Sequence, residues 1–314
     1  MKSTASLSVG ADQAAIQSAI AVSELPWPSV QPNAWRSVMD VAIDWTTICA
    51  AAWEAFRIGG WAIPLAIILI GNRQRALGNL LHDAGHKNLS VSRKVNDRTA
   101  CIFLAPALFN SLVVYRREHA KHHAWLGEPA RDPDFIPRLA SMSDRWLHAY
   151  LRSLANPTAW VGSLLGHLPS KCLSTRETLS IFVWWGIYES ALGVFVGVRF
   201  ALLFFSLWMV AKGTVFHAIT TFREMTDHYG LKPPGIFRYT RDVPDHGLVS
   251  MLLHPHHNGY HLTHHLLPHV PYYHLPTVHR LLRQIPFFER QAIVCEAYLN
   301  SSPSAVDGWE AHNG

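Results

Sequence analysis

Histidine is the residue type whose number and spacing stand out in this chain. There are 20 histidines in 314 residues, and 14 of them fall within the short stretches 82–86, 119–123 and 254–279. Histidine is the commonest protein ligand for metal ions, because a neutral imidazole offers a lone pair on one ring nitrogen. The clustering therefore indicates a metal site to which several segments contribute.

The spacing inside each cluster suits a helix. His82 and His86 are four residues apart, so a helix places them on one face, where they can hold one ion. An HxxHH pattern occurs twice, at His119, His122 and His123 and again at His261, His264 and His265. Within each pattern, residues three or four apart share a face, while the adjacent pair diverges by about 100°. Such a triplet can serve two metals lying side by side.

Eight histidines in three patterns exceed what one tetrahedral ion can use, so two ions with about four histidines each are indicated. Imidazole suits zinc, copper, iron and nickel alike, and the spacing does not choose among them. A single HxxxH pair is weak evidence, since many such pairs are structural; three patterns beside apolar segments favour a functional site. The cysteines lie far apart and form no CxxC pair, which argues against a disulfide framework or a zinc site: Cys49, Cys101, Cys172 and Cys295.

The composition is that of a membrane protein with sizeable water-facing parts. Apolar residues make up 49% and charged residues 16%, against about 25% charged in soluble domains. Mean hydropathy is only +0.08. The net charge of +5 comes without a run of Lys or Arg, which argues against nucleic-acid binding. No apolar run of the length found in a signal peptide occurs before residue 35, so none is expected.

The apolar segments predict an all-α membrane protein with about four transmembrane helices in two hairpins and a cytosolic histidine-rich cap. The first hairpin comprises residues 35–56 and 60–81, the second running on to His86; the other occupies 179–222 with a turn at 193–199. Residues 101–115 are apolar for too short a stretch to span. We expect a loose N-terminal lead-in at 1–33, one domain at 34–299 and a polar tail at 300–314.

This topology places all three histidine clusters just outside span ends on one side of the membrane. The same side carries many basic residues, so the positive-inside rule makes it cytoplasmic. These residues are Arg73, Arg75, Lys87, Arg93, Lys94, Arg116, Arg117 and Lys121.

HDAGH at 82–86, REHAKHH at 117–123 and YHLTHHLLPHVPYYHLPTVHRLL at 260–282 resemble the membrane fatty acid desaturase and hydroxylase superfamily. The resemblance covers about residues 60–285. It implies a centre of two iron ions (Fe2+/Fe3+) with O2 as co-substrate, which desaturates or hydroxylates a lipid or acyl substrate from the bilayer. Electrons would come from a separate donor, either ferredoxin-like or cytochrome-type with a reductase. We expect an integral protein of a bacterial inner membrane rather than of the endoplasmic reticulum.

The resemblance also implies a ligand set of nine histidines. The eight in the patterns are joined by His228 in FREMTDHYG, where Asp227 replaces the more usual Glu, while His217 is held in reserve as a structural histidine. Gly259 and Thr263 depart from the family pattern without removing a ligand. Candidate partners for the ligating rings are Asp83, Glu118, Glu224, Asp227, Asn258 and His257, with Asp134 in the RDPD motif also considered.

Three functions remain open on the sequence. Acyl-chain desaturation is favoured; hydroxylation of a lipid, carotenoid or specialised metabolite on the same scaffold is the alternative. A metal transporter or haem-binding membrane protein is a third reading, but a transporter should carry its ligands near the midplane of the spans. The basic residues Arg116, Arg117 and Lys121 would favour an acidic ferredoxin-like donor or anionic headgroups.

Overall fold

The computed structural model describes residues 4–137, 145–245, 247–299 and 303–309, and these contain helices, turns and two isolated β-bridges. The chain forms two compact units: unit 1 comprises residues 1–32, 116–153 and 222–314, and unit 2 comprises 33–115 and 154–221. Helices α5 (Leu112–Ala124), α6 (Trp146–Leu154) and α10 (His217–His228) contain unit boundaries. The remaining elements of unit 2 are α2 (Ala34–Ile58), α3 (Ala62–His86), α4 (Arg93–Phe103), α7 (Pro157–Leu165), α8 (Thr175–Phe195), α9 (Val198–Ala211) and the π-helical segment η1 (Lys212–Phe216).

In unit 2, α2 and α3 form the first predicted helical pair. The Asn33 side chain caps the start of α2, and Gly59 ends it with a positive φ of 64°. Two acids of α2 face protein partners: Asp40 pairs with Arg36, and the inaccessible Asp44 pairs with Arg73 of α3 at 3.0 Å. A buried carboxylate needs such a partner. Asp40 and Asp44 therefore face protein partners, whereas Glu54 of the same helix is exposed.

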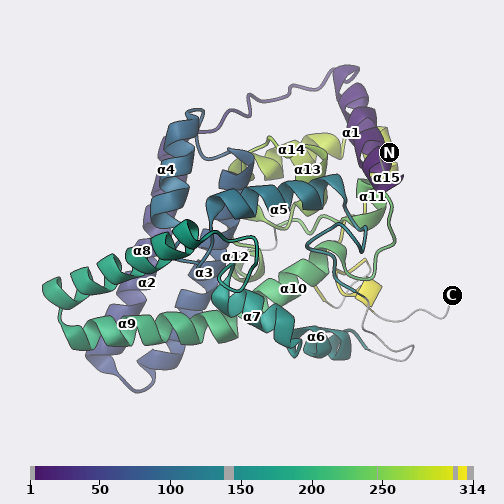
Figure 1. Cartoon of the computed structure of the whole chain (residues 1–314). Coiled ribbons are helices and arrows are strands. Elements are labelled where there is room, and N and C mark those ends of the chain that lie inside the picture. The colour runs from purple at the N-terminus through teal and green to yellow at the C-terminus, as the bar shows by residue number, and fades with distance from the viewer. Residues whose placement is uncertain (1–3, 138–144, 246, 300–302, 310–314) are drawn as a thin grey trace. The chain divides into compact units, whose positions relative to one another are not determined.

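The second predicted pair is α8 and α9, which lie side by side (Figure 1). A capping box of Ser174 and Glu177 begins α8, and Gly197 with φ 121° forms the turn inside the predicted stretch 193–199. In the described part of the chain, two stretches are long and apolar enough to cross a membrane on length and composition alone: Thr175–Phe195 and Val198–His228. The polar residues of α2 and α3 lower their mean hydropathy, so the four-span topology stays a prediction.

The π-helical segment η1 is tied to α7 by its own polar groups. The buried Lys212 ammonium donates to the Ser163 carbonyl at 2.6 Å, and the Trp160 indole donates to the Gly213 carbonyl. Carbonyls in the last turn of a helix lack intrahelical partners, and the Lys212 ammonium satisfies one of those at the end of α7. The π-helical segment and α7 therefore stabilise each other.

Unit 1 contains the short helices of the C-terminal half, and α1 packs against them. These are α11 (Ile236–Tyr239), α12 (Leu248–Leu253), α13 (His261–Leu266), α14 (Leu275–Leu282) and α15 (Pro286–Gln291), with 3-10 turns at Pro255–His257, Tyr272–His274 and Asp307–Trp309. Helix α1 (Thr4–Ala21) is a regular helix within the stretch 1–33, for which the sequence predicted a loose lead-in. Its Asp12 accepts from the Ile236 N–H at 2.6 Å, and its Gln13 donates to the His265 carbonyl at 3.0 Å. The N-terminal segment thus supports α11 and α13.

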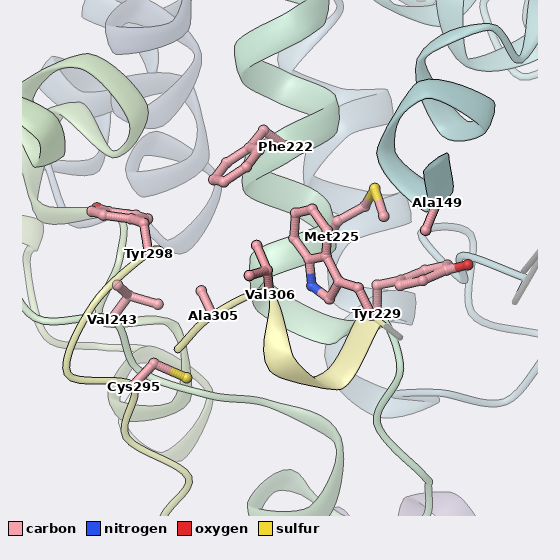
Figure 2. Close-up of a cluster of buried hydrophobic side chains, with 10 residues drawn as sticks. Ala149, Phe222, Met225, Tyr229, Val243, Cys295, Tyr298, Ala305 and Val306 are labelled. Atoms are coloured by element: carbon pink, nitrogen blue, oxygen red, sulfur yellow. The ribbon is translucent and has the colours of Figure 1, made fainter. Parts of the chain in front are cut away.

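An apolar core of unit 1 lies against α10 (Figure 2). Phe222 and Met225 of α10 and Tyr229 just after it contribute one side of this core, and Trp309 near the C-terminus is fully buried against them. The Trp309 ring lies 5.1 Å from that of Phe222. Ala305, Val306 and Trp309 of the predicted polar tail are therefore part of the core.

Candidate metal centre

Helix α5 presents the first HxxHH pattern as its spacing predicts. The rings of His119 and His123, one turn apart, lie together with 3.1 Å between their Nε2 atoms. His122, adjacent to His123 and therefore turned away from it along the helix, has its Nε2 3.3 Å from that of His265. The three histidines thus contribute to two separate sets of nitrogen atoms.

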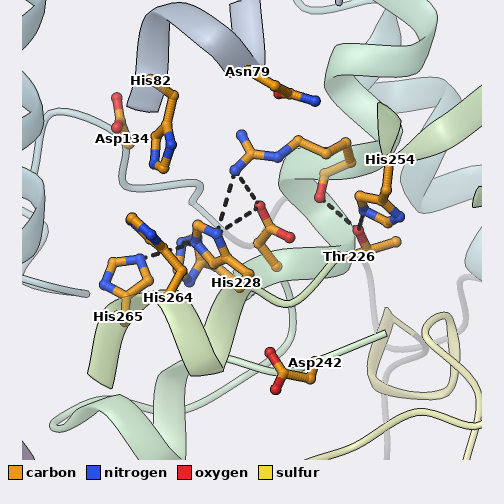
Figure 3. A network of polar contacts seen from close by, with 12 residues as sticks. Asn79, His82, Asp134, Thr226, His228, Asp242, His254, His264 and His265 are labelled. Atoms are coloured by element: carbon orange, nitrogen blue, oxygen red, sulfur yellow. Dashed lines mark hydrogen bonds and ion pairs between the residues drawn. The ribbon is translucent and has the colours of Figure 1, made fainter. Parts of the chain in front are cut away.

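Four of the histidines form a buried set in unit 1, which we name set B. It consists of His122, His228, His261 and His265, whose ligand atoms all lie within 4.8 Å of one another. The Nε2 atoms of His228 and His261 are 2.9 Å apart, and those of His261 and His265 are also 2.9 Å apart. The rings come from α5, α10 and α13, and Figure 3 shows His228 and His265 at this site.

A second set, named set A, lies beside it in unit 1 and consists of His119, His123 and His264. The Nε2 atoms of His123 and His264 are 3.2 Å apart. The rings of His123 in set A and His265 in set B stack with centroids 4.2 Å apart, so the two sets adjoin. In unit 2, His82 and His86 lie one turn apart at the end of α3, with ring centroids 5.1 Å apart.

The nitrogen separations in set B fit a bound metal ion. A zinc ion binds imidazole at about 2.0–2.1 Å, so two such nitrogens at angles of about 90–110° lie about 2.9–3.4 Å apart. Moreover, the Nδ1 atoms of His122 and His228 bond to oxygen atoms that can only accept, at 2.8 Å each. In the neutral rings, Nε2 then carries the lone pair. Lone pairs directed into one small space repel each other unless a cation lies among them.

Three groups orient the rings of set B. The buried carboxylate of Asp132 accepts from His122, and the Tyr239 carbonyl accepts from His228. The Asp227 carboxylate lies 3.5 Å from the Nδ1 atom of His261 and 2.6 Å from the Arg223 guanidinium. Metal-binding histidines commonly have such partners, which fix the ring direction and the tautomer.

Burial also keeps ligand rings of set B neutral. It lowers the pKa of His261 and His265 well below the ordinary histidine value, and the neighbouring histidines lower it further. Burial acts in the same direction on His122, but its hydrogen bond to Asp132 and the charges of Asp134 and Asp132 outweigh it and raise the pKa of His122. The carboxylate therefore makes the His122 ring more basic, which strengthens it as a ligand.

Residues 16–295 match the sequence profile of the family described as fatty acid desaturase. This chain belongs to the fatty acid desaturase family. The match confirms the resemblance and supports an oxidoreductase of a membrane-associated family that typically uses iron. A relative, dihydrorhizobitoxine desaturase of Bradyrhizobium elkanii, is 26% identical over 288 residues, which cover 84% of this chain and 80% of the relative.

Two of the predicted partner residues in this desaturase-family protein lie near a ligand ring. Asp227 lies at His261, as described, and the Asp83 carboxylate is 3.7 Å from the Nδ1 atom of His82. Glu118 pairs instead with Arg117 and Lys121.

Of the remaining candidates, three are placed elsewhere and Asp134 lies near His122. Glu224 is exposed, and His257 bonds to Asp245 at 2.6 Å rather than to either histidine set. Asn258 is buried, and its amide oxygen has no hydrogen-bond partner among the described residues. Asp134 lies 3.9 Å from His122, and its side chain is 58% exposed.

His217, the reserve candidate, is a structural histidine of unit 2. Its Nε2 atom bonds to the Leu154 carbonyl at 2.9 Å, and its Nδ1 atom bonds to the Ser163 hydroxyl at 2.8 Å. Both ring nitrogens are thus used by the bundle. The structure supports keeping His228 and setting His217 aside.

Three orienting groups were missed by sequence reasoning. Asp132 stands two residues before Asp134 in the RDPD motif, so the motif was the available signal. The Tyr239 carbonyl has no sequence signature. Asp242 accepts from the backbone N–H and hydroxyl of Thr263 and bonds to His279 at 2.7 Å, and it thereby holds the middle of the third pattern.

Proposed function

We propose that this protein is a membrane-bound di-iron oxygenase that introduces a carbon–carbon double bond into a lipid or acyl chain. The observation that carries the proposal is the pair of adjoining histidine sets, each with ring nitrogens at metal-binding separations. Family membership supports both the choice of iron and a desaturase or hydroxylase type of reaction.

We further propose that His82 and His86 complete set A. Their four-residue spacing on α3 suits one ion, and the family resemblance assigns them as ligands. Set A would then have five histidines and set B four. The full ligand list is His82, His86, His119, His122, His123, His228, His261, His264 and His265.

Bound iron would supply the activation of O2 for removing hydrogen from an unactivated carbon. The residues of this chain hold the histidine rings of the site in place and bury them. The buried rings of His122 and His228 present Nε2 lone pairs, and Asp132 and the Tyr239 carbonyl fix their direction, while Asp227 lies beside His261. No cysteine belongs to either set, so the ligand type suits iron with open positions rather than a closed structural zinc site.

Unit 2 offers an apolar cavity suited to a hydrocarbon chain. Its volume is about 520 Å³, within the usual range of ligand sites. The wall includes Val41, Ala42, Ile102, Ile187 and Ala191. The nearby indole N–H groups are already used, since Trp45 donates to the Phe103 carbonyl and Trp184 to the Ile102 carbonyl. Apolar walls of this kind support a lipid substrate.

The alternative on the same scaffold is oxidation of a specialised metabolite, by desaturation or hydroxylation. The relative from Bradyrhizobium elkanii favours this alternative, because its name specifies dihydrorhizobitoxine as its substrate. Family membership by itself therefore does not set the substrate class.

The proposed enzyme has four spans with the histidine sets on the cytoplasmic side, in a bacterial inner membrane. A separate ferredoxin-like or cytochrome-type donor supplies electrons. The basic side chains of Arg117 and Lys121 are about half exposed and lie on the helix that carries the first HxxHH pattern. They would attract an acidic donor, and the attraction would weaken with salt.

The test combines metal analysis with product analysis. The purified protein should hold close to two irons, and expression in a host lacking the activity should yield an oxidised product, sought by mass spectrometry in lipid and polar extracts. The variant His265→Ala should lose iron and product, while His148→Ala, at an exposed histidine outside both sets, should keep both. A single stoichiometric zinc, with activity surviving iron chelation, would contradict the proposal.

A further inference from the structure

Residues 303–309 lie beyond the family match, which ends at residue 295, yet they pack against Tyr229 and Gly230, the two residues that follow His228 of set B. We name this segment the clasp. Two hydrogen bonds hold it in a turn: the Ser304 hydroxyl donates to one carboxylate oxygen of Asp307, and the Ser304 backbone N–H donates to the other at 2.7 Å. Its Ala305 N–H donates to the Ala297 carbonyl at 2.9 Å, and its Trp309 is fully buried.

The clasp touches the chain next to His228 in two ways. His228 is the last residue of α10, and Tyr229 and Gly230 follow it. Gly230 has φ 80°, and a Cβ atom there would lie 1.7 Å from the Gly308 carbonyl oxygen, so the two backbones are in direct contact. The Trp309 ring lies 6.4 Å from the Tyr229 ring. Any side chain at position 230 must push the clasp away or displace the end of α10.

The buried Arg241 joins the clasp to the end of α10 and to the segment that precedes α13. The Arg241 guanidinium donates to the Ala305 carbonyl at 2.7 Å and also to the Tyr229 carbonyl. Arg241 stands between Thr240 and Asp242; the residue before Thr240 supplies the carbonyl that orients His228, and Asp242 holds Thr263 between the ligands of α13. The clasp, the end of α10 and the start of α13 therefore share one buried connection.

We propose that the clasp is a positioning element for His228, which sets how tightly set B binds its metal while leaving set A much less affected. This inference rests on the proposed metal centre. Partners one layer behind metal ligands change metal affinity by about 10–100-fold when they are altered. A displacement of the clasp should act in that range, because it moves the backbone next to His228 and, through Arg241, the segment whose Tyr239 carbonyl orients the His228 ring.

The test uses full-length variants in detergent, titrated with Co2+ in competition with a chelator, which reports each metal affinity separately from activity. Gly230→Ala combines a positive φ with the clash against Gly308. Its matched control is Gly247→Ala, in the same unit, with φ 62° and nothing within 4 Å of the added Cβ. A second pair is Trp309→Ala against Trp309→Phe, in which the smaller change retains a ring.

Gly230→Ala and Trp309→Ala should weaken one of the two Co2+ sites by about 10–100-fold. Gly247→Ala should leave both sites within about twofold, and Trp309→Phe should restore most of the affinity. The proposal is overturned if the variants lose thermal stability but bind both ions normally, or lose both ions equally. A wild-type protein that binds no metal would instead refute the proposed function itself, so the two failures are distinguishable.

Discussion

The orientation of His122 depends on Asp132. One carboxylate oxygen of Asp132 accepts from the His122 Nδ1–H at 2.8 Å, and the other accepts from the Gly127 backbone N–H at 2.8 Å. In Asp132→Asn, one of these oxygens becomes an NH2 group. That group must face either the His122 and Asp134 N–H donors or the Gly127 donor, so contacts between donors replace at least one buried hydrogen bond.

The size of the effect follows from these contacts. A hydrogen bond to a charged group contributes about 1.5–3 kcal/mol. A 10–100-fold change in metal affinity corresponds to about 1.4–2.7 kcal/mol, the range found for partners of metal-binding histidines. We therefore expect Asp132→Asn to weaken metal binding by set B about 10–100-fold. Asp134→Asn is the control: its carboxylate is 3.9 Å from His122 and 58% exposed, so the loss should stay below about fivefold.

The assay is chelator competition for Co2+ or Fe2+ with each purified variant, together with thermal melting of the metal-free protein to separate affinity from folding. The reasoning fails if Asp134→Asn weakens binding more than Asp132→Asn does. It also fails if Asp132→Asn binds both ions as the wild type does.

Three further outcomes follow from the site. His228→Ala should lose one metal and the activity while the protein still folds, whereas His217→Ala should keep its metal and lose about 1–3 kcal/mol of stability through its two buried hydrogen bonds; the reverse metal contents would show that the wrong histidine was chosen. Burial lowers the pKa of His261 and His265 below the unfolded value, so below about pH 6.5 the unfolded chain takes up protons that the folded chain does not. The metal-free protein should therefore lose about 1.4 kcal/mol of stability per pH unit for each such histidine, and melting that is independent of pH between 7.5 and 5.5 would oppose this. Removal of metal by a chelator should lower the free energy of unfolding by about 2.7 kcal/mol if the free metal had been at 100 times its dissociation constant, and equal melting curves with and without metal would argue against a bound ion.

Features encoded by local spacing were predictable. The apolar run that begins at residue 60 is too short to span by itself, which predicted that the helix would run on to His86, and α3 ends there. The HxxHH patterns predicted that neighbouring histidines would diverge, and α5 sends His122 and His123 to different sets. Helix periodicity acts over a few residues, so sequence alone can reveal it.

Features that depend on where distant segments meet could not be predicted. Asp132 and Asp134 are equally close to the second pattern in sequence, and only the backbone path decides which carboxylate reaches His122. Glu118 and His257 were predicted to orient histidine rings because they are close to the patterns in sequence. Instead, Glu118 pairs with Lys121 and His257 bonds to Asp245, both partly exposed residues. The burial of Trp309 depends on α10, about 80 residues earlier in the chain, so a short stretch of apolar residues in a polar tail gave no signal.

Because the histidines of set B are far apart along the chain, the ribosome makes them at different times. His122 and His265 meet across 143 positions, and Gln13 meets the His265 carbonyl across 252. At about 5–20 residues per second, the ribosome needs about 7–29 s to make the stretch between the two histidines. During that interval the first HxxHH pattern is an open chelating surface without its later partners. A metal ion can meet all four histidines of set B only once translation has passed His265, so the supply of metal matters most at the end of synthesis.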